Sequence, residues 1–230
     1  MKKQYCIVNF ENKKIIDKLK QYGYICIPTE KSACVSEPIS LHADVLYLKK
    51  GEKEIFVSEC QKNNISLLKQ LGYSITPVKL MSGYRTECKL NMIITDKSII
   101  CNPETCADLS LEDKTKNIIN VKQGYTKCAT VVMGNENFIT EDNGIFNALQ
   151  NAGKNCLLIE KGYVNLDGYS YGFIGGASVF LSEKNTLLFF GDISAHPDFY
   201  KIKKFCEDAG VDTEWINDIT ITDIGGAVEL

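Results

Sequence analysis

Hydrophobic and polar positions follow one order that recurs along this chain. In residues 45–84, two apolar runs separated by the polar turn "KKGEKE" predict a pair of strands. Leu67, Leu68 and Leu71 then recur at helical spacing, and Gly72 is placed to end that helix. A third apolar run follows, so the predicted unit is strand, turn, strand, helix, strand.

Three further segments repeat this order. Residues 90–125 carry it with a weaker helix, and residues 129–163 carry it with a clear helix that ends at Gly153. Residues 177–216 carry it again, with a predicted helix over Pro197–Gly210. A fixed element order at such a period predicts an architecture built from structural repeats.

The two ends of the chain together supply a fifth unit. Residues 225–230 give its first strand, residues 4–10 its second, residues 11–23 its helix and residues 24–29 its third strand. A single unit leaves strand edges and an apolar face open, so it needs neighbours. Five units in a ring would bury those edges, whereas an open α/β sheet is the alternative arrangement. We predict the ring, as one domain over residues 1–230.

Five such units resemble the pentein fold of the guanidino-modifying enzymes, which include arginine and agmatine deiminases, dimethylarginine dimethylaminohydrolases and amidinotransferases. The resemblance covers the whole chain at the level of repeat order. It implies an α/β fold, a five-bladed propeller with pseudo-fivefold symmetry that is closed by pairing of the N- and C-terminal strands. The fold also includes a non-catalytic translation factor that keeps ribosomal subunits apart, so the resemblance implies either an enzyme or a binding protein.

Composition narrows the partners and the compartment. The chain has 230 residues and a formal net charge of −3, which argues against a nucleic-acid partner. No apolar run reaches the length of about 18 residues that spans a membrane. The ten cysteines are spread along the chain, mostly in strand-like runs, and are expected to be thiols of a cytoplasmic protein. A closed metal site needs more ligands than their spacing offers, so no metal is expected.

The candidate chemistry lies at the start of each inner strand, because these positions face the axis of a propeller. Three of the five stretches carry reactive or titratable residues and two carry glycine pairs. In chain order the stretches are "SLHADV" at 40–45, "RTECKLN" at 85–91, "YTKCATV" at 125–131, "GFIGGAS" at 172–178 and "TDIGGAV" at 222–228.

His42 and Asp44 resemble the His-x-Asp motif of the deiminases. A histidine titrates near neutral pH, and a nearby carboxylate can orient its ring and stabilise its charged form. The resemblance implies that His42 is the general acid–base and that Asp44 orients it or contacts the substrate.

The nucleophile is predicted to be a cysteine, since a thiolate attacks carbon centres readily. Cys128 starts an inner strand beside Lys127, a cation that favours a thiolate, and lies two repeats beyond His42. Cys88 is the second candidate, but the adjacent Glu87 should raise its pKa.

The glycine pairs Gly175–Gly176 and Gly225–Gly226 stand where the deiminases carry a Glu-Gly-Gly-Asp-like motif. Here both pairs lie in Ile-Gly-Gly-Ala, so the glycines remain without the acids. Around the ring, the order of glycine pair, His-x-Asp and Cys matches the linear order of the family. A permuted ring is therefore predicted, with His42 and Cys128 side chains within about 8 Å of each other.

These residues predict Cys-dependent hydrolysis or transfer at an amidine-like or amide C–N bond. A small-molecule substrate is expected in a central channel, positioned by Asn91, Lys127, Asp142 and the two glycine pairs. Asp142 and the preceding Glu141 also stand at a predicted helix start, where a carboxylate commonly caps free amides. No cofactor is expected, because thiolate chemistry needs none. The alternative is a non-catalytic binding or scaffold protein, which the absent acids favour.

Overall fold

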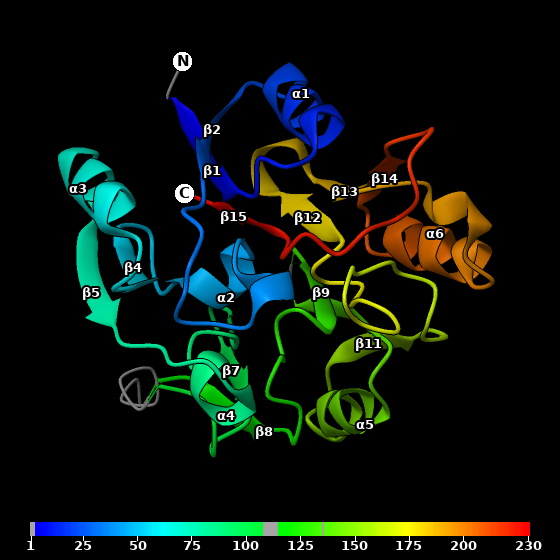
Figure 1. Cartoon of the computed structure of the whole chain (residues 1–230). Helices are drawn as coiled ribbons and strands as arrows, with labels where there is room; N and C mark the ends of the chain where they lie inside the picture. Colours follow the sequence, from blue (N-terminus) through cyan, green and yellow to red (C-terminus); the bar gives the residue numbers. More distant parts are fainter. Residues whose placement is uncertain (1–2, 108–114, 135) are drawn as a thin grey trace.

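The strands among the described residues form five separate three-stranded sheets. The computed structural model describes residues 3–107, 115–134 and 136–230, and Figure 1 shows the five sheets around a common centre. In each sheet the middle strand pairs antiparallel with the first strand and parallel with the third. No sheet closes on itself within these residues.

The strands follow the repeat order predicted from the sequence. The first sheet in the chain contains β3 (Tyr47–Lys49), β4 (Glu54–Ser58) and β5 (Ser74–Val78), and the second contains β6 (Ile93–Ile94), β7 (Ser98–Cys101) and β8 (Asn117–Asn120). The third contains β9 (Thr130–Met133), β10 (Asn137–Thr140) and β11 (Asn155–Leu158), and the fourth contains β12 (Ser178–Leu181), β13 (Thr186–Phe189) and β14 (Asp212–Trp215). The fifth sheet contains β15 (Ala227–Glu229), β1 (Gln4–Val8) and β2 (Tyr24–Pro28).

In four of the sheets a helix connects the two parallel strands. These helices are α1 (Lys13–Gln21), α3 (Lys62–Gln70), α5 (Asn143–Asn151) and α6 (Phe199–Asp208). Shorter helical segments are η1 (Glu37–Ile39), α2 (Ala43–Leu46), α4 (Tyr84–Glu87), η3 (Ser182–Lys184) and η4 (Ile193–Ala195). The connection in which the weaker helix was predicted includes residues 108–114, which lie outside the described residues.

The fifth sheet joins the first and last strands of the chain, as the repeat order predicts. Ile7 of β1 stands opposite Val228 of β15, and Cys6 stands opposite Glu229. The hydroxyl of Tyr24 on β2 donates a hydrogen bond to the carboxylate of Glu229. Segments more than 200 residues apart in sequence therefore form one sheet.

The hydrophobic core follows the middle strands. Ile7, Val57, Ile100, Ile139 and Leu187 each lie near the middle of such a strand, and none is more than 1% exposed. Each connecting helix covers its sheet with an apolar face. A strand buried on both faces reads as a continuous apolar run, which is the pattern that these middle strands show in the sequence.

Two of the ten cysteines are not thiols, which corrects the sequence expectation. Cys34 and Cys60 form a disulfide, whereas the other eight cysteines, all within the described residues, form none. The side chain of Gln61 exchanges two hydrogen bonds with the backbone of Glu30, and this contact brings the segment after β2 against the turn after β4. Spacing along the chain does not reveal such a contact between units.

No helix among the described residues is long and apolar enough to cross a membrane.

Candidate functional site

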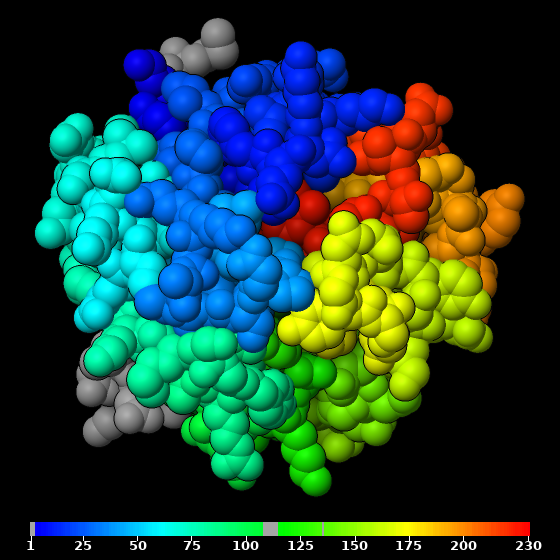
Figure 2. Space-filling model, in the orientation of Figure 1, coloured from blue at the N-terminus to red at the C-terminus, as the bar shows by residue number. Residues whose placement is uncertain are grey.

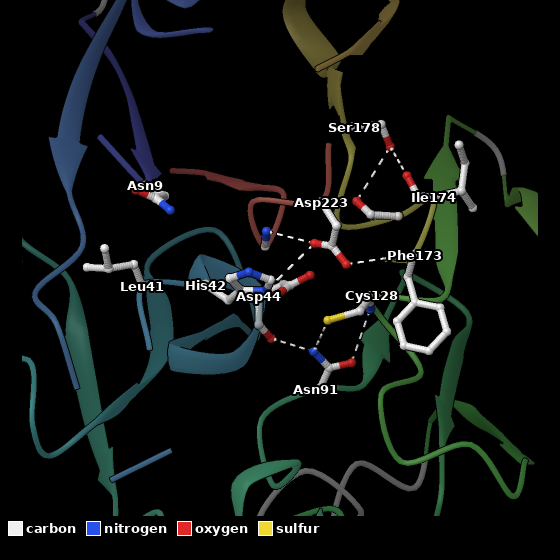
Figure 3. A network of polar contacts seen from close by, with 12 residues as sticks. Asn9, Leu41, His42, Asp44, Asn91, Cys128, Phe173, Ile174, Ser178 and Asp223 are labelled. Carbon is white, nitrogen blue, oxygen red and sulfur yellow. Dashed lines mark hydrogen bonds and ion pairs between the residues drawn. The ribbon is translucent and has the colours of Figure 1, made fainter. Parts of the chain in front are cut away.

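Three reactive side chains meet where the five sheets converge. One ligand atom from each of His42, Asp44 and Cys128 lies within 4.8 Å of the others, so the predicted proximity of His42 and Cys128 is confirmed. His42 is the N-cap residue of α2, Asp44 lies in the first turn of that helix, and Cys128 precedes β9 by two residues. All three are at most 4% exposed. Figure 3 shows their side chains together with those of Asn91 and Asp223.

Asn91 connects this cluster across two units. Its Nδ2 donates to the backbone oxygen of Asp44 at 3.1 Å and to Sγ of Cys128 at 2.9 Å. Its Oδ1 accepts from the backbone N–H groups of Lys127 and Cys128 at 2.8 and 3.1 Å. The side chain of Asn91 therefore positions Cys128, and its predicted contact with a substrate stays a prediction.

The glycine pairs complete a circle of hydrogen bonds around the centre. Gly176 N–H donates to the backbone oxygen of Cys128 at 3.0 Å, and Gly226 N–H donates to the oxygen of Gly176 at 2.7 Å. Asp44 N–H then donates to the oxygen of Gly225 at 3.0 Å. Together with Asn91, these bonds link the inner segments of all five units.

The glycines are needed because the segments approach one another closely. A Cβ atom on Gly225 would lie 2.3 Å from Cα of His42, and Gly225 has a φ of +79°. A Cβ atom on Gly176 would lie 2.0 Å from Oδ1 of Asp223, and one on Gly175 would lie 2.4 Å from the oxygen of Lys127. These glycines position the site through close packing, which is the role glycine has in tight backbone approaches.

Asp223 is a further residue of the site, which the sequence motifs did not predict. Its Oδ1 lies 3.6 Å from Nδ1 of His42 and accepts from Gly225 N–H at 2.9 Å, while its Oδ2 accepts from Phe173 N–H at 2.9 Å. Burial and the Asp44 charge raise the pKa of Asp223 to about 6, although His42 and the two N–H groups oppose this rise. Asp223 directly precedes Ile224-Gly225-Gly226, and this position in the sequence could have indicated its role. Asp223 therefore supplies an acid beside this glycine pair.

Glu141 supplies an acid beside the other glycine pair. Its Oε1 accepts from Ile174 N–H at 3.3 Å, its Oε2 has no hydrogen-bond partner, and the side chain is 5% exposed. Burial and the Asp223 charge raise the pKa of Glu141 to about 8. Glu141 lines a cavity of about 310 Å³, together with Lys161, Tyr171 and other residues. A position at the start of a helix accounts for a carboxylate at residue 141. It does not account for the burial of Glu141 or for the missing hydrogen-bond partner of its Oε2.

Two loops cover the His42–Cys128 cluster on the side of the molecule that Figure 2 shows. In the space-filling view, the yellow segment between β11 and β12 meets the blue segment before α2 near the centre (Figure 2). A Cβ atom on Gly168 would lie 2.8 Å from Cγ of Pro38, so the two segments are in contact. The His42–Cys128 cluster is therefore shielded from solvent on this face.

The Cys128 thiol holds its proton in the free protein. Burial and the charges of Asp44 and Asp223 raise the pKa of Cys128 well above its ordinary value. The neighbouring Lys127 was expected to favour a thiolate, but its own pKa is lowered by burial. Attack by Cys128 therefore requires a base that removes the proton, and the imidazole of His42 is within reach.

Cys88 has a different environment. Its Sγ donates to the backbone oxygen of Tyr84 at 2.7 Å, and burial raises the pKa of its thiol to about 12, with a further contribution from Glu87. The predicted effect of Glu87 on this thiol is therefore in the expected direction. Cys88 is not part of the His42–Cys128 cluster.

Asp142 is the N-cap residue of α5, as the helix-start pattern indicates. Its side chain accepts a hydrogen bond from Ile145 N–H at 2.9 Å, and it also accepts from Gln123 at 3.3 Å. Asp142 lines the same cavity as Glu141. Its contact with a substrate stays a prediction.

The His42, Asp44 and Cys128 cluster could also hold a metal ion. Imidazole nitrogen, carboxylate oxygen and thiolate sulfur are all ligands that zinc accepts, and no other such group of three occurs among the described residues. The cluster therefore has a donor set that fits zinc as well as a geometry that fits thiol chemistry.

Comparisons with solved structures identify the fold. A dimethylarginine dimethylaminohydrolase matches with a TM-score of 0.57 and 8% identity, with 100% of each chain covered. An agmatine deiminase from C. jejuni matches with a TM-score of 0.56 and 9% identity over 94% of this chain and 87% of the other. SxtG, an amidinotransferase from Microseira wollei in the saxitoxin biosynthetic pathway, matches with a TM-score of 0.55 and 10% identity over 93% and 88%.

Sequence comparisons give a family without a described activity. No curated protein sequence gives a significant match. The family model described as a family of unknown function, DUF6873, matches residues 7–228. The chain therefore belongs to DUF6873, and it shares its fold with these guanidino-modifying enzymes.

Proposed function

We propose that this protein is a Cys-dependent hydrolase or transferase that acts on the C–N bond of an amidine-like or amide group. The observation that carries the proposal is the cluster of thiol, imidazole and carboxylate within 4.8 Å at the centre of the fold. A nucleophile beside a general base that is itself oriented by a third group is the arrangement that covalent catalysis requires. The structural neighbours, which are hydrolases and transferases of guanidino groups, support the same class of chemistry at the level of the fold.

Each side chain has one role in this scheme. His42 removes the thiol proton as Cys128 attacks the carbon, and it then delivers that proton to the leaving nitrogen. Asp223, 3.6 Å from Nδ1 of His42, orients the ring and stabilises its charged form. In the hydrolase, water then attacks the carbon and breaks its bond to sulfur, and Cys128 regains a proton.

The ring of five units belongs to the same proposal. We take the five sheets to be the blades of a closed propeller around a pseudo-fivefold axis. The circle of hydrogen bonds through Asp44, Asn91, Cys128, Gly176 and Gly225–Gly226 supports this closure, because it links the five inner segments in order. The pairing of β15 with β1 supports it in the fifth unit.

A binding or scaffold protein of the same fold is the second candidate. The observation that favours it is the shielding of the cluster, in which His42, Asp44 and Cys128 are at most 4% exposed and the thiol is protonated. In such a protein, the cluster would hold the five inner segments together without turnover.

Turnover separates the two candidates. Release of ammonia or amine is measured with small amides, amidines and guanidino compounds, in a buffer that contains a chelator. We expect Cys128→Ala and His42→Ala to lower the rate at least about 100-fold, and Cys156→Ala, a buried thiol on β11, to leave it unchanged. Full activity of Cys128→Ala would exclude the proposed nucleophile. Binding of a compound without turnover by the wild-type protein would establish the second candidate.

A further inference from the structure

A central channel runs between the inner strands of all five sheets. Its volume is about 210 Å³, and its lining residues come from β3, β6, β9, β12 and β15 together with the segments that precede them. Each of these strands contributes at least one partly exposed residue to the lining. These residues are Lys49, Ile94, Val132, Phe180, Ala227, Val228 and Glu229.

Most of the channel wall is apolar. Leu48, Leu90, Ile93 and Val179 line its buried part and are less than 8% exposed. A polar group inside such a wall would lose its water without gaining a partner, whereas an apolar group gains from burial. An apolar cavity of about 150 Å³ accommodates benzene, so this channel has room for one ring or a short aliphatic chain.

Four charged side chains interrupt the apolar wall, namely Asp44, Lys49, Lys127 and Glu229. Two of them, Asp44 and Lys127, belong to the reactive cluster or directly precede Cys128 in the chain. Asp44 lines the channel, and neither of its carboxylate oxygens has a hydrogen-bond partner. Lys127 also lines it, and its ammonium makes no hydrogen bond or ion pair with any of the described residues. The Asp44 carboxylate lies within 4.8 Å of the Cys128 thiol, so this polar end of the channel adjoins the nucleophile.

The Asp44 carboxylate and the Lys127 ammonium are together complementary to a carboxamide. A carboxylate only accepts hydrogen bonds, and an ammonium only donates them. A primary carboxamide presents N–H donors and a carbonyl acceptor side by side, so it can satisfy Asp44 and Lys127 at once. An amidinium or guanidinium presents donors alone, and its positive charge would be repelled by Lys127.

We infer that the substrate is a small neutral carboxamide with a short apolar tail, which lies in the central channel with its amide group between Asp44 and Lys127. This inference rests on the proposed function and specifies its substrate class. The tail contacts the aliphatic wall, the amide nitrogen donates to Asp44, and the carbonyl oxygen accepts from Lys127. The carbonyl carbon then lies beside Cys128.

The reaction balances as hydrolysis of an amide. Cys128 forms a C–S bond while His42 takes its proton, and Lys127 stabilises the charge that develops on the carbonyl oxygen. The C–N bond breaks, and ammonia leaves with the proton from His42. Water then adds to the thioester, the C–S bond breaks, and the products are the carboxylic acid and the regenerated thiol.

Binding is tested with Cys128→Ser, which keeps the shape of the site but cannot form the thioester. The reference probe is phenylacetamide, and two further probes each change one of its features. Phenylacetamidine has an amidine in place of the carboxamide, and acetamide lacks the phenyl tail. Calorimetry should show phenylacetamide binding at least about tenfold more tightly than either of the others. Tighter binding of phenylacetamidine, or equal binding of acetamide, would overturn the inference.

Three further variants, each made in Cys128→Ser, assign the contacts. Lys127→Met should remove the preference for the amide over the amidine, because it keeps the length of the side chain and removes its charge. Val132→Phe should weaken phenylacetamide at least about tenfold by filling the channel mouth, whereas Ile118→Phe, on the exposed face of β8, should not. An unchanged preference in the Lys127→Met variant, while its melting temperature matches that of Cys128→Ser, would contradict the assigned contact.

Ammonia release by the wild-type protein separates this inference from the proposed function. Turnover of phenylacetamide supports both. Tight binding of phenylacetamide to Cys128→Ser without turnover by the wild-type protein supports the ligand class and refutes the chemistry. Turnover of guanidino compounds, with no binding of the amide, supports the chemistry and refutes the ligand class.

Discussion

Carboxyl groups near the centre of the molecule hold protons at pH values where exposed acids have lost them. Burial raises the pKa of Glu141 to about 8 and that of Asp223 to about 6. A charged carboxylate is costly to bury when its hydrogen bonds are incomplete, and Oε2 of Glu141 has no partner. The native protein therefore binds more protons at these positions than the unfolded chain does, in the pH range between the unfolded and folded pKa values.

This difference in proton binding sets a pH dependence of stability that Glu141→Gln should reduce. A folded pKa above the unfolded value of about 4.3 means that the free energy of unfolding falls as the pH rises through this window. The variant lacks this loss, so its stability relative to wild type should increase by ~1–3 kcal/mol between pH 5 and pH 8 and then level off. Urea unfolding at several pH values measures the difference. A constant difference across this range would show that Glu141 is ionised in the native protein.

The contact between the segment before β15 and helix α2 links two elements that lie far apart in the sequence. Gly225 lies against His42, where its hypothetical Cβ atom would be 2.3 Å from both Cα and Cβ of the histidine. The N–H of Asp44 donates to the oxygen of Gly225 at 3.0 Å. Backbone contact with the segment before β15 therefore fixes the position of helix α2. The position of α2 in turn determines where the His42 imidazole lies.

Gly225→Ala tests this contact, and Gly23→Ala is its matched control. Both glycines have positive φ angles, +79° and +92°, but a Cβ atom on Gly23 would meet nothing within 4 Å. The two variants share the backbone strain, and only Gly225→Ala adds the clash with His42. We expect Gly225→Ala to destabilise the protein by ~1–3 kcal/mol more than Gly23→Ala, as measured by urea unfolding. Equal losses in the two variants would show that α2 moves away without cost.

At the scale of the whole molecule, the repeats were predictable and the contacts between them were not. Each unit follows a local pattern of apolar runs, so element order could be predicted from the sequence. Equivalent positions in repeats also indicated that His42 and Cys128 lie close together. Asp223 was not predicted as a site residue, and Glu141 was interpreted only as a helix-start carboxylate. The groups that contact these two acids, such as His42 and the N–H groups of Phe173 and Ile174, lie far from them in the sequence. The same holds for the disulfide between Cys34 and Cys60.

The fifth sheet allows the chain to be opened at a different place. β15 and β1 form the antiparallel pair that a short turn joins in each of the other four sheets, and Leu230 N–H donates to the oxygen of Tyr5 at 3.0 Å. A linker of about three glycine and serine residues from Leu230 to Lys3 should therefore act as a hairpin turn. The new ends would lie between Glu52 and Lys53, in the equivalent turn of the first sheet.

This circular permutant should fold with the far-ultraviolet circular dichroism of the original chain and a single cooperative unfolding transition. If the five units form a closed ring, moving the break from one hairpin to the equivalent hairpin removes no strand pairing and no contact at the centre. The same linker with new ends inside α5, between Asn147 and Ala148, is the control and should be strongly destabilised, since it interrupts a helix. A permutant opened at Glu52 that is as unstable as this control would contradict the equivalence of the two hairpins, and with it the closed ring.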